Sequence, residues 1–573
     1  MRLRLTVLLA AAAVAPRQQA APVPPADLVL DGAAVYTMDA PRSWAEAVAV
    51  RDGRVVFVGT SAGARAFVGP RTRVLKLQGR MLLPAFQDAH AHPISGGIEL
   101  GLCDLNDIPT AAGVLARVRE CATQMGSKPW ISGGGWLLPV FPGGNPKKED
   151  LDAIVPDKPA YFSAADGHSS WVNSKALALA GITKDTADPK DGRIERDPTS
   201  GEPTGTLRES ASDLVSRHMP EPTLEERVAG LGRAQALFAA AGVTAVQEAS
   251  AGSGAEGAGA KPTLEAYREA ERRGQLTLRV VANLTADPAR GPEQVADMAK
   301  LRSAYTSARL RLTNAKIFAD GVIEPRTAAM LEPYTDRPGD RGEPIFAPEA
   351  LNALVGRLAA ERFGVHVHAI GDRAVRITLD AFEAARRRPE NADLRFQITH
   401  LEVIDPADIP RFRRHNVVAN FQALWAYADD YIVDMTWGGL GPERSRWIYP
   451  IGSVVHAGGP LALGSDWSVS SLKPLDAIQV ALTRQGLTEP RRPAMVPEEA
   501  IDLPTALAGY TIGSAYANGL EKETGSIEVG KAADLVVLER NLFEVSAFEI
   551  AKQRVMLTLL EGTPVYRAPE IEW

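Results

Sequence analysis

Eight short apolar segments with the character of β-strands recur along this chain, and each is separated from the next by enough residues for a helix. Such alternation of strands and helices is typical of a parallel sheet. Eight parallel strand–helix units close most naturally as a TIM-like (β/α)8 barrel, in which active-site residues follow the carboxyl ends of the strands. We therefore expect an α/β fold built on a barrel. The segments lie within residues 81–93, 242–247, 276–283, 311–318, 364–368, 395–399, 417–423 and 460–464.

Two parts of the chain do not fit a simple barrel. The stretch between the first two strands, about residues 93–230, is far too long for one helix and predicts an inserted subdomain. Short strand-like pieces punctuated by Gly and Asp lie near both chain ends, which predicts a small β-sandwich domain built from both ends. The expected boundaries are 26–83 for the N-terminal part of the sandwich, 84–500 for the barrel, and 501–573 for the last barrel helix and the rest of the sandwich.

Residues 1–25 have the layout of a secretory signal peptide. Arg2 and Arg4 precede an apolar run over residues 5–15, and a stretch rich in Pro and Ala follows. The run is too short to span a bilayer permanently, so we expect no stable membrane span after removal of the signal. The prediction is a periplasmic or secreted protein. A disordered start on a cytoplasmic protein is the alternative.

The composition of the chain bears on which kinds of molecule it could bind. The 573 residues carry a formal net charge of -7, which gives no reason to expect nucleic acid or an anionic membrane. The proportion of hydrophobic residues, 45%, is ordinary for a soluble enzyme. The two cysteines, Cys103 and Cys121, would form one disulfide in an oxidising compartment or two buried thiols in the cytoplasm, and their spacing does not decide between these.

Side chains suited to a metal site follow several of the predicted strands. His90 and His92 share one face of a strand, and two imidazoles aimed the same way can bind one zinc ion. A His-x-His pair alone arises often by chance, so the later strand ends decide the interpretation. In strand order the set is His90 and His92, Lys316, His368, His400 and Asp466. The pattern predicts a metal centre at the carboxyl end of the barrel.

These residues, together with several longer phrases, resemble the amidohydrolase superfamily, specifically amidohydrolase family 3 and its N-substituted formamide deformylase-like members. The phrases are DGHSSWVNS at 166–174, KIFADG at 316–321, HAIGD at 368–372 and the stretch 525–538. The resemblance covers nearly all of the chain after the signal.

The resemblance implies how the six residues divide between metals. His90 and His92 would hold the more buried ion with Asp466, and His368 and His400 would hold a second. A lysine ammonium has no lone pair for a metal, but in this superfamily such a lysine typically carries CO2 as a carbamate that bridges both ions. The expectation is two Zn²⁺ bridged by carboxylated Lys316. A one-metal site is the alternative if Lys316 pairs with Asp320 or Glu324 instead, and manganese or iron are alternatives to zinc.

The implied activity is hydrolysis of a C–N bond other than a peptide bond, as expected of EC class 3.5. Zinc lowers the pKa of bound water from about 15.7 to about 7, so a metal-bound hydroxide would attack the carbonyl carbon of a small amide-like substrate. Asp466 would act as general acid/base, passing the proton to the leaving amine. Ester or lactone hydrolysis at the same centre is one alternative. A noncatalytic binding or regulatory protein on the hydrolase fold is another, and a homodimer is a possible assembly.

Three further residues are candidates for contact with substrate. His168 lies in the insertion within a phrase shared by the family, where it would reach over the barrel mouth. Trp136 follows three glycines and would either line the pocket or pack in a core. Arg326 would bind a substrate carboxylate or pair with Glu324. A second histidine of the fifth strand, His366, is expected in the core or behind the ligands.

Overall fold

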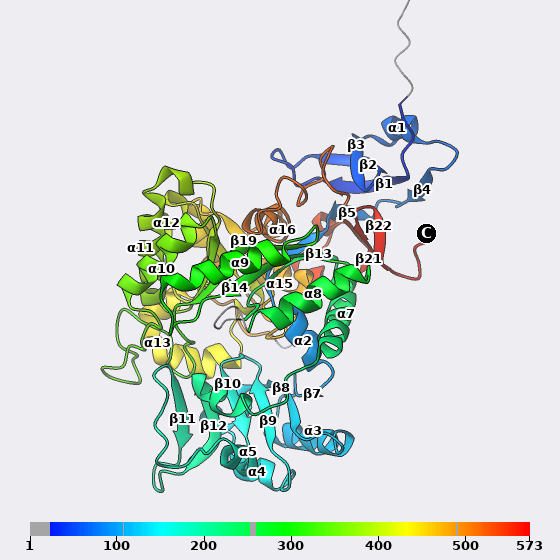
Figure 1. Ribbon diagram of the computed structural model, residues 1–573. Helices are drawn as coiled ribbons and strands as arrows, with labels where there is room; N and C mark the ends of the chain where they lie inside the picture. Colours follow the sequence, from blue (N-terminus) through cyan, green and yellow to red (C-terminus); the bar gives the residue numbers. More distant parts are fainter. Residues whose placement is uncertain (1–22, 107, 253–258, 489–490) are drawn as a thin grey trace, which may run out of the picture.

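The computed structural model describes residues 23–106, 108–252, 259–488 and 491–573, so nearly all of the predicted signal peptide lies outside the described residues. Three hydrogen-bonded sheets organise these parts of the chain. Figure 1 shows the barrel in the middle, with the residues of the predicted insertion on one side and a sheet from both chain ends on the other. The α/β fold with a nearly closed, eight-stranded parallel barrel confirms the central expectation.

The barrel sheet is parallel throughout and follows chain order. Because consecutive strands are neighbours, all eight carboxyl ends lie at one rim. The strands are β6 (Phe86–Ala91), β13 (Val243–Glu248), β14 (Arg279–Thr285), β15 (Leu310–Phe318), β16 (Gly364–Ala369), β17 (Phe396–His400), β18 (Val417–Phe421) and β19 (Leu461–Leu463).

Helices cover the outer face of this sheet (Figure 1). The longest carry amphipathic patterns whose apolar positions are buried, such as Leu351, Val355 and Leu358 of α10. The helices that follow the barrel strands are α2 (Pro93–Glu99), α7 (Leu224–Ala240), α8 (Lys261–Arg272), α9 (Val295–Tyr305), α10 (Pro348–Ala360), α11 (Asp372–Arg386), α12 (Ile409–Arg414), α13 (Trp437–Arg444), α14 (Ile451–His456), α15 (Pro474–Thr483), α16 (Leu503–Ala508) and α17 (Ser514–Ala517).

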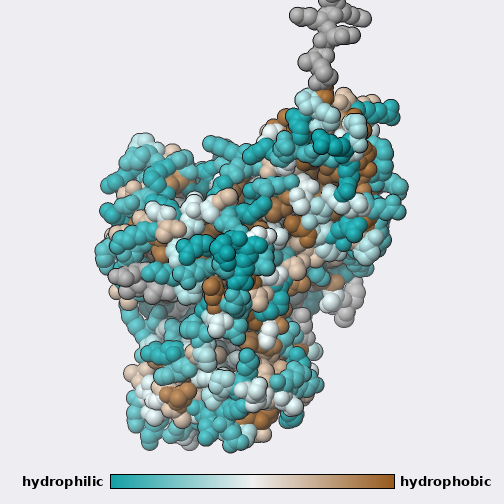
Figure 2. Space-filling view, turned by 45° about the vertical axis from the view of Figure 1, so that its right-hand side comes forward, coloured by the Kyte–Doolittle hydropathy of each residue, from teal (hydrophilic) through white to brown (hydrophobic). Residues whose placement is uncertain are grey.

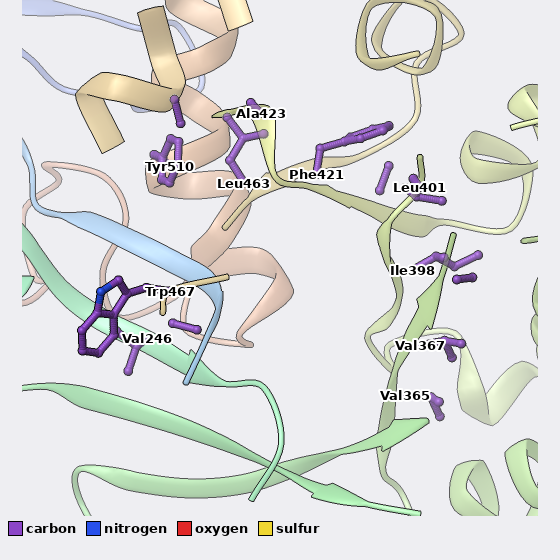
Figure 3. Close-up of a cluster of buried hydrophobic side chains, with 14 of the residues drawn as sticks. Val246, Val365, Val367, Ile398, Leu401, Phe421, Ala423, Leu463, Trp467 and Tyr510 are labelled. Atoms are coloured by element: carbon purple, nitrogen blue, oxygen red, sulfur yellow. The ribbon is translucent and has the colours of Figure 1, made fainter. Parts of the chain in front are cut away.

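Successive side chains of a barrel strand point to opposite faces, so one set packs in the apolar core and the other faces the predicted metal site. Val365 and Val367 of β16 point away from the barrel interior and pack in the apolar layer beneath the helices (Figure 3). His366 and His368 occupy the intervening positions and are buried on the opposite, inner face. The apolar half of each strand therefore stabilises the barrel, while the polar half supplies its chemistry.

The first and last strands meet at the rim through two backbone hydrogen bonds. Asp466 N donates to His90 O at 2.7 Å, and His92 N donates to Trp467 O at 2.7 Å. A Cβ atom at Gly464 would lie 2.7 Å from the backbone nitrogen of His90, so this approach requires glycine. The contact brings Asp466 beside the His-x-His pair.

The segment 81–93 is two strands rather than one. β5 (Met81–Pro84) pairs with β1 and β20, whereas β6 belongs to the barrel. The change occurs at Ala85, whose N–H donates to Asp534 O, while the N–H of Phe86 donates to Gly242 O. Every residue of both strands is buried, so burial alone does not mark the boundary.

Strands from both chain ends lie in one eight-stranded sheet, whereas the sandwich that we expected would have two sheets facing each other. Strand β5 contacts both β1 and β20, so it joins the N-terminal and C-terminal strands. The short helix α1 (Ser61–Ala64) packs beside the N-terminal strands. The strands are β1 (Leu28–Tyr36), β2 (Trp44–Arg51), β3 (Arg54–Gly59), β4 (Arg73–Lys76), β5, β20 (Leu535–Leu538), β21 (Val555–Leu560) and β22 (Thr563–Arg567).

Between β6 and β13 the chain forms a separate six-stranded mixed sheet with its own apolar core. Its strands are β7 (Cys103–Asp104), β8 (Ile131–Trp136), β9 (Ala160–Ala164), β10 (Ser169–Val172), β11 (Gly192–Arg196) and β12 (Pro203–Glu209). Four helices accompany them: α3 (Ala111–Gln124), α4 (Lys148–Asp152), α5 (Ser174–Leu179) and α6 (Asp213–Ser216).

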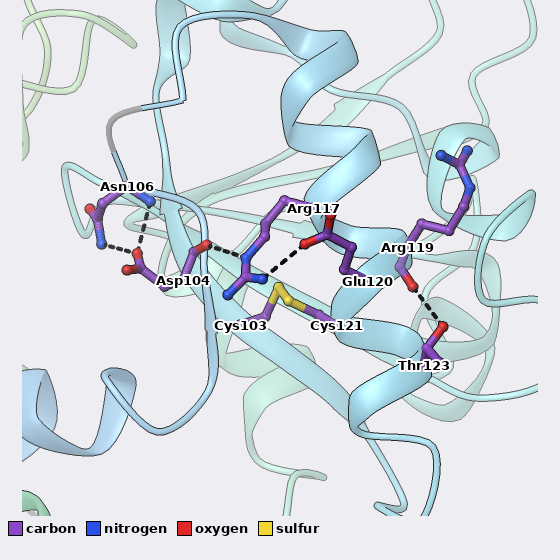
Figure 4. Close-up of a disulfide and its surroundings, with 8 residues drawn as sticks. All are labelled: Cys103, Asp104, Asn106, Arg117, Arg119, Glu120, Cys121 and Thr123. Atoms are coloured by element: carbon purple, nitrogen blue, oxygen red, sulfur yellow. Dashed lines mark hydrogen bonds and ion pairs between the residues drawn. A yellow bond between two sulfur atoms is a disulfide. The ribbon is translucent and has the colours of Figure 1, made fainter.

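Cys103 and Cys121 form a disulfide that links β7 to α3 (Figure 4). Both residues are buried in the apolar core of this sheet. Of the two alternatives that the spacing left open, the structure therefore contains the disulfide.

Hydrophilic residues cover most of the face in Figure 2, with hydrophobic ones interspersed. Within the described part of the chain, none of the helices has the length and apolar character needed to cross a membrane.

Candidate metal centre

The six predicted ligands converge at the carboxyl end of the barrel, on five different strands. Lys316 pairs in register with His366, and Ala369 with His400, so neighbouring strands deliver their side chains at similar heights. Each of the six side chains is mostly buried; His92 is the most exposed, at 25%. The ligands come from β6 (His90, with His92 directly after it), β15 (Lys316), β16 (His368), β17 (His400) and the turn after β19 (Asp466).

Asp466 lies at the centre of the histidines. Its Oδ1 atom is 3.3 Å from Nε2 of His90 and 3.1 Å from Nε2 of His92, and its Oδ2 is 3.7 Å from Nδ1 of His400. Oδ1 is buried and makes no hydrogen bond of normal geometry with the described residues. A buried carboxylate oxygen facing two imidazole nitrogens without such a bond is the arrangement expected of a shared metal ligand.

Groups behind the ligands fix the orientation of their rings. Nδ1 of His90 lies 2.7 Å from Nε2 of His366 and 3.1 Å from Oγ1 of Thr399, which leaves Nε2 facing Asp466. Nδ1 of His400 lies 2.8 Å from Oε1 of Gln422. Metal-ligating histidines commonly use one nitrogen for the metal and the other for such a contact.

The residues present fit a divalent metal ion. Donor atoms of His90, His400 and Asp466 all lie within 4.8 Å of one another. Burial lowers the pKa of His90 to about 3 and the pKa of His400 well below its usual value, so both imidazoles are neutral and have a lone pair to donate. Burial raises the pKa of Asp466, but the adjoining imidazoles outweigh it and keep that pKa well below the usual range.

Lys316 lies beside these ligands, and the carboxylate whose charge acts on its ammonium group is that of Asp466. Its Nζ is 4.7 Å from the ring centre of Phe318, and its side chain is 1% exposed. Burial lowers the pKa of this ammonium group from 10.5 to about 7. Within the described part of the chain, Lys316 does not form the alternative ion pair with Asp320 or Glu324. A large fraction of the amine is uncharged near neutral pH.

His368 lies at the edge of the centre. Its ring centre is 4.5 Å from that of His400, and its Nε2 is 3.1 Å from the carbonyl oxygen of Gly321. Burial lowers the pKa of His368 well below its usual value. It is therefore a neutral ring placed between the ligands of β17 and the loop that follows β15.

His168 reaches the barrel from the inserted sheet. Its ring centre lies 5.3 Å from that of His368, and its Nδ1 lies 2.8 Å from Oε2 of Glu209. Thr327 donates a hydrogen bond to the other oxygen of Glu209, at 2.7 Å, which ties this pair to the barrel. Burial lowers the pKa of His168, but the charge and hydrogen bond of Glu209 outweigh it and raise the pKa to about 9. At neutral pH this imidazole is a cation beside the metal ligands.

Trp136 packs in the core of the inserted sheet. Its side chain has no exposed surface, its indole N–H donates to the carbonyl of Phe162 at 2.9 Å, and its ring contacts those of Phe141 and Trp171. Of the two interpretations that the sequence allowed, the structure agrees with core packing, because no atom of this side chain is free to meet a substrate.

The guanidinium group of Arg326 is likewise bound to other groups of the protein. It forms an ion pair with Asp336 at 2.5 Å, and its remaining N–H groups donate to the carbonyls of Ile323 and Met435. The expected alternative partner, Glu324, contributes only its backbone carbonyl. A substrate carboxylate would have to displace Asp336.

Several polar residues that support the centre were not among the sequence predictions. Asp88 accepts hydrogen bonds from the N–H groups of His90 and Ser465, both at 3.0 Å, and so holds β6 against the turn after β19. Glu248 ends β13, and its Oε1 lies 3.8 Å from Nδ1 of His92. Both are buried carboxylic acids on barrel strands, and a charged residue within a strand expected to be buried was the available signal. Glu209 lacked such a signal, because its role depends on the position of the inserted sheet.

Comparisons with known proteins agree with this geometry. The model of the amidohydrolase family matches residues 73–566. Protein LONG AFTER FAR-RED 3 of Arabidopsis thaliana is 31% identical over 547 residues, which cover 94% of this chain and 92% of that protein. N-substituted formamide deformylase of Arthrobacter pascens is 28% identical over 555 residues, covering 94% and 98%.

A solved structure of an uncharacterized metal-dependent hydrolase from Pyrococcus furiosus has a TM-score of 0.69 and 27% sequence identity, covering 90% of this chain and 99% of that one. The family match extends from the sheet built by both chain ends through the whole barrel. The chain therefore belongs to the amidohydrolase family, in the branch known as amidohydrolase family 3.

Proposed function

We propose that this protein is a metal-dependent hydrolase that cleaves the C–N bond of a small amide-like substrate. The observation that carries the proposal is the placement of Asp466 Oδ1 against the Nε2 atoms of both His90 and His92. Membership in a family of hydrolases and likeness to a metal-dependent hydrolase support the reaction class.

The residues present suit two zinc ions. His90, His92 and Asp466 would hold one ion, His368 and His400 the other, and a carbamate on Lys316 would bridge them. Bound zinc supplies Lewis-acid polarisation of the carbonyl and an acidified water. Neutral imidazoles and a carboxylate are ligands that zinc accepts. The uncharged fraction of Lys316 supports carbamate formation, because only a free amine reacts with CO2.

The protein's own groups would manage protons and orientation. Asp466 accepts a proton from the attacking water and delivers it to the nitrogen of the leaving amine. His90 is held in one orientation by His366, so the geometry around Asp466 is preorganised. The His168 imidazolium, fixed by Glu209, would donate a hydrogen bond to the substrate carbonyl oxygen as negative charge develops there.

Removing the metal tests this proposal. Dialysis against a chelator is expected to abolish hydrolysis of a set of N-formyl and N-acyl amines, and added Zn²⁺ is expected to restore it. Rates and metal content are measured in the same samples, with heat-denatured protein plus Zn²⁺ as the control. Hydrolysis that persists at full rate in metal-free protein would contradict the proposal. Activity on esters but on no matching amide would instead support an esterase or lactonase at this centre.

We further propose that the protein works in the periplasm or outside the cell. The disulfide between Cys103 and Cys121 supports this location, because such bonds persist in oxidising compartments. Mass spectrometry of the protein from a bacterial host is expected to show a mature chain that lacks about the first 25 residues, in the periplasmic fraction. A full-length chain recovered only from the cytoplasm would contradict the prediction.

A further inference from the structure

Glu248 is a buried carboxylic acid that strand pairing places beside His92. It ends β13 and lies opposite Ala91 of β6 in the parallel register, and the N–H of Ala249 donates to the carbonyl oxygen of Ala91 at 2.8 Å. Because His92 directly follows Ala91, the side chain of Glu248 lies next to this histidine, with its Oε1 atom 3.8 Å from Nδ1. The side chain of Glu248 is only 3% exposed.

Tyr267 of α8 holds the carboxyl group of Glu248 from the other side. Its hydroxyl group donates to Oε2 of Glu248 at 2.8 Å, and its ring is buried in the apolar core between helices and barrel. An enclosed polar group is costly unless it is hydrogen-bonded, so this contact stabilises one position of the carboxyl group. In that position the other oxygen, Oε1, faces His92.

The two ring nitrogens of His92 face different groups. Nε2 lies 3.1 Å from Oδ1 of Asp466, whereas Nδ1 faces Glu248. A neutral imidazole has one N–H group and one nitrogen with a free lone pair, so Nε2 can bind a metal ion only when the proton is on Nδ1. A hydrogen-bond acceptor beside Nδ1 favours that form of the ring. The oxygen of Glu248 is such an acceptor.

His92 needs such a partner more than the two neighbouring histidines do. Its side chain is 25% exposed, while those of His90 and His400 are 1% and 5% exposed and are held by packing. Nδ1 of His90 and Nδ1 of His400 already have hydrogen-bonding partners at 2.7 and 2.8 Å. The corresponding contact of His92 is the one with Glu248.

We propose that Glu248 is a positioning residue of the metal centre: it accepts the N–H of Nδ1 and so keeps Nε2 of His92 directed at the metal, while Tyr267 fixes the carboxyl group. This inference rests on the metal centre of the proposed hydrolase. The separation of 3.8 Å between Nδ1 and Oε1 is expected to shorten to about 3.2 Å or less when Nε2 binds zinc. The result is tighter binding of the ion held by His90, His92 and Asp466.

Zinc affinity tests this role without a substrate. Glu248→Leu removes both acceptor oxygens and is expected to weaken binding of one zinc ion about 10- to 100-fold, the range typical of groups that orient metal ligands. Glu248→Gln retains an amide oxygen for Nδ1 of His92 and is expected to stay within about threefold of the wild type. Tyr267→Phe should weaken binding by a smaller factor than Glu248→Leu. Affinities are measured by competition with a fluorescent chelator, and folding is checked by circular dichroism.

Tyr305→Phe is the matched control. Tyr305 also donates to a glutamate, Glu265, at 3.2 Å, but it lies just before β15 begins, at the opposite end of the barrel from the predicted ligands. This variant should keep the wild-type zinc affinity. The visible spectrum of protein loaded with Co²⁺ gives a second readout, which should change in Glu248→Leu and persist in Glu248→Gln and Tyr305→Phe. Wild-type affinity and spectrum in folded Glu248→Leu would overturn the proposal.

A crystal structure of the zinc-loaded wild type provides a measurement that needs no variant. Nδ1 of His92 is expected within about 3.2 Å of Oε1 of Glu248, and a distance above about 3.5 Å would refute the positioning role while leaving the proposed hydrolase intact. A wild type that binds zinc but hydrolyses no amide would contradict the proposed function alone, because affinity and distance still decide the role of Glu248. A wild type that binds no zinc would overturn both.

Discussion

Replacing Asp466 with Asn is expected to lower kcat by about 10³-fold, within the range of about 10² to 10⁴ typical of general acid–base catalysis. An asparagine keeps a carbonyl oxygen of similar size but cannot take up a proton. Since Asp466 Oδ1 is placed against His90 and His92, the substitution removes the proton carrier with little change in shape. We expect most of the bound metal to remain, because the histidines are retained.

The measurement is kcat on an N-acyl anilide together with metal content for each preparation. Asp476→Asn is a suitable control, because Asp476 is also a buried carboxylate downstream of β19 but bonds to Ser471. It should leave kcat within about twofold. Near-normal turnover by Asp466→Asn with full metal content would show that another group moves the proton. Loss of all metal would show that Asp466 acts mainly as a ligand.

Replacing Lys316 with Ala is expected to reduce bound zinc from about two ions to about one per chain, and kcat by at least about 10²-fold. A carbamate would supply two oxygen atoms as a bridge, and alanine supplies none. The loss of one Lewis acid removes several kcal/mol of transition-state stabilisation. Zinc content by mass spectrometry and kcat on the same substrate give the two readouts.

The pKa of Lys316 also gives this prediction a pH dependence. Burial lowers that pKa to about 7, so the amine is mostly free above this pH and mostly protonated below it. Reconstitution with Zn²⁺ and bicarbonate is therefore expected to load two ions at pH 8 and closer to one at pH 6. Lys316→Gln, which keeps the bulk of the side chain, should bind one ion at both pH values. An unchanged metal content in Lys316→Ala would exclude the bridging carbamate.

The location of the metal centre could be predicted from the sequence because a parallel barrel brings residues at its strand ends close together, however far apart they lie in the chain. The predicted ligands are spread over hundreds of residues of the chain. Each lies at or near the end of a strand, as His90, Lys316, His400 and Asp466 show. In a parallel barrel these ends lie at one rim, so no knowledge of side-chain contacts was needed. The i and i+2 spacing of His90 and His92 similarly predicted that both side chains would share one face, and in the structure both lie against Asp466.

The substrate residues could not be placed in this way. Trp136 and Arg326 have the chemistry of pocket residues, but one is in the core of the inserted sheet and the other is paired with Asp336. The contacts of both side chains depend on residues that only the folded chain brings next to them. A β-domain built from both chain ends was predicted, but its form as one sheet joined through β5 was not, because β5 is apolar at every position and its partner β20 lies far away in sequence.

The sequence by itself indicated the barrel through strand periodicity and the order of the strands, and it indicated the family and six candidate ligands through the resemblance of its motifs. Tertiary structure alone decided the partners of each side chain, such as His366 behind His90 and Glu209 beside His168. These contacts join distant segments, and whether a buried polar atom finds a donor depends on packing in three dimensions. The metal centre was therefore predictable from the chain, while the groups that orient its ligands could be identified only from the fold.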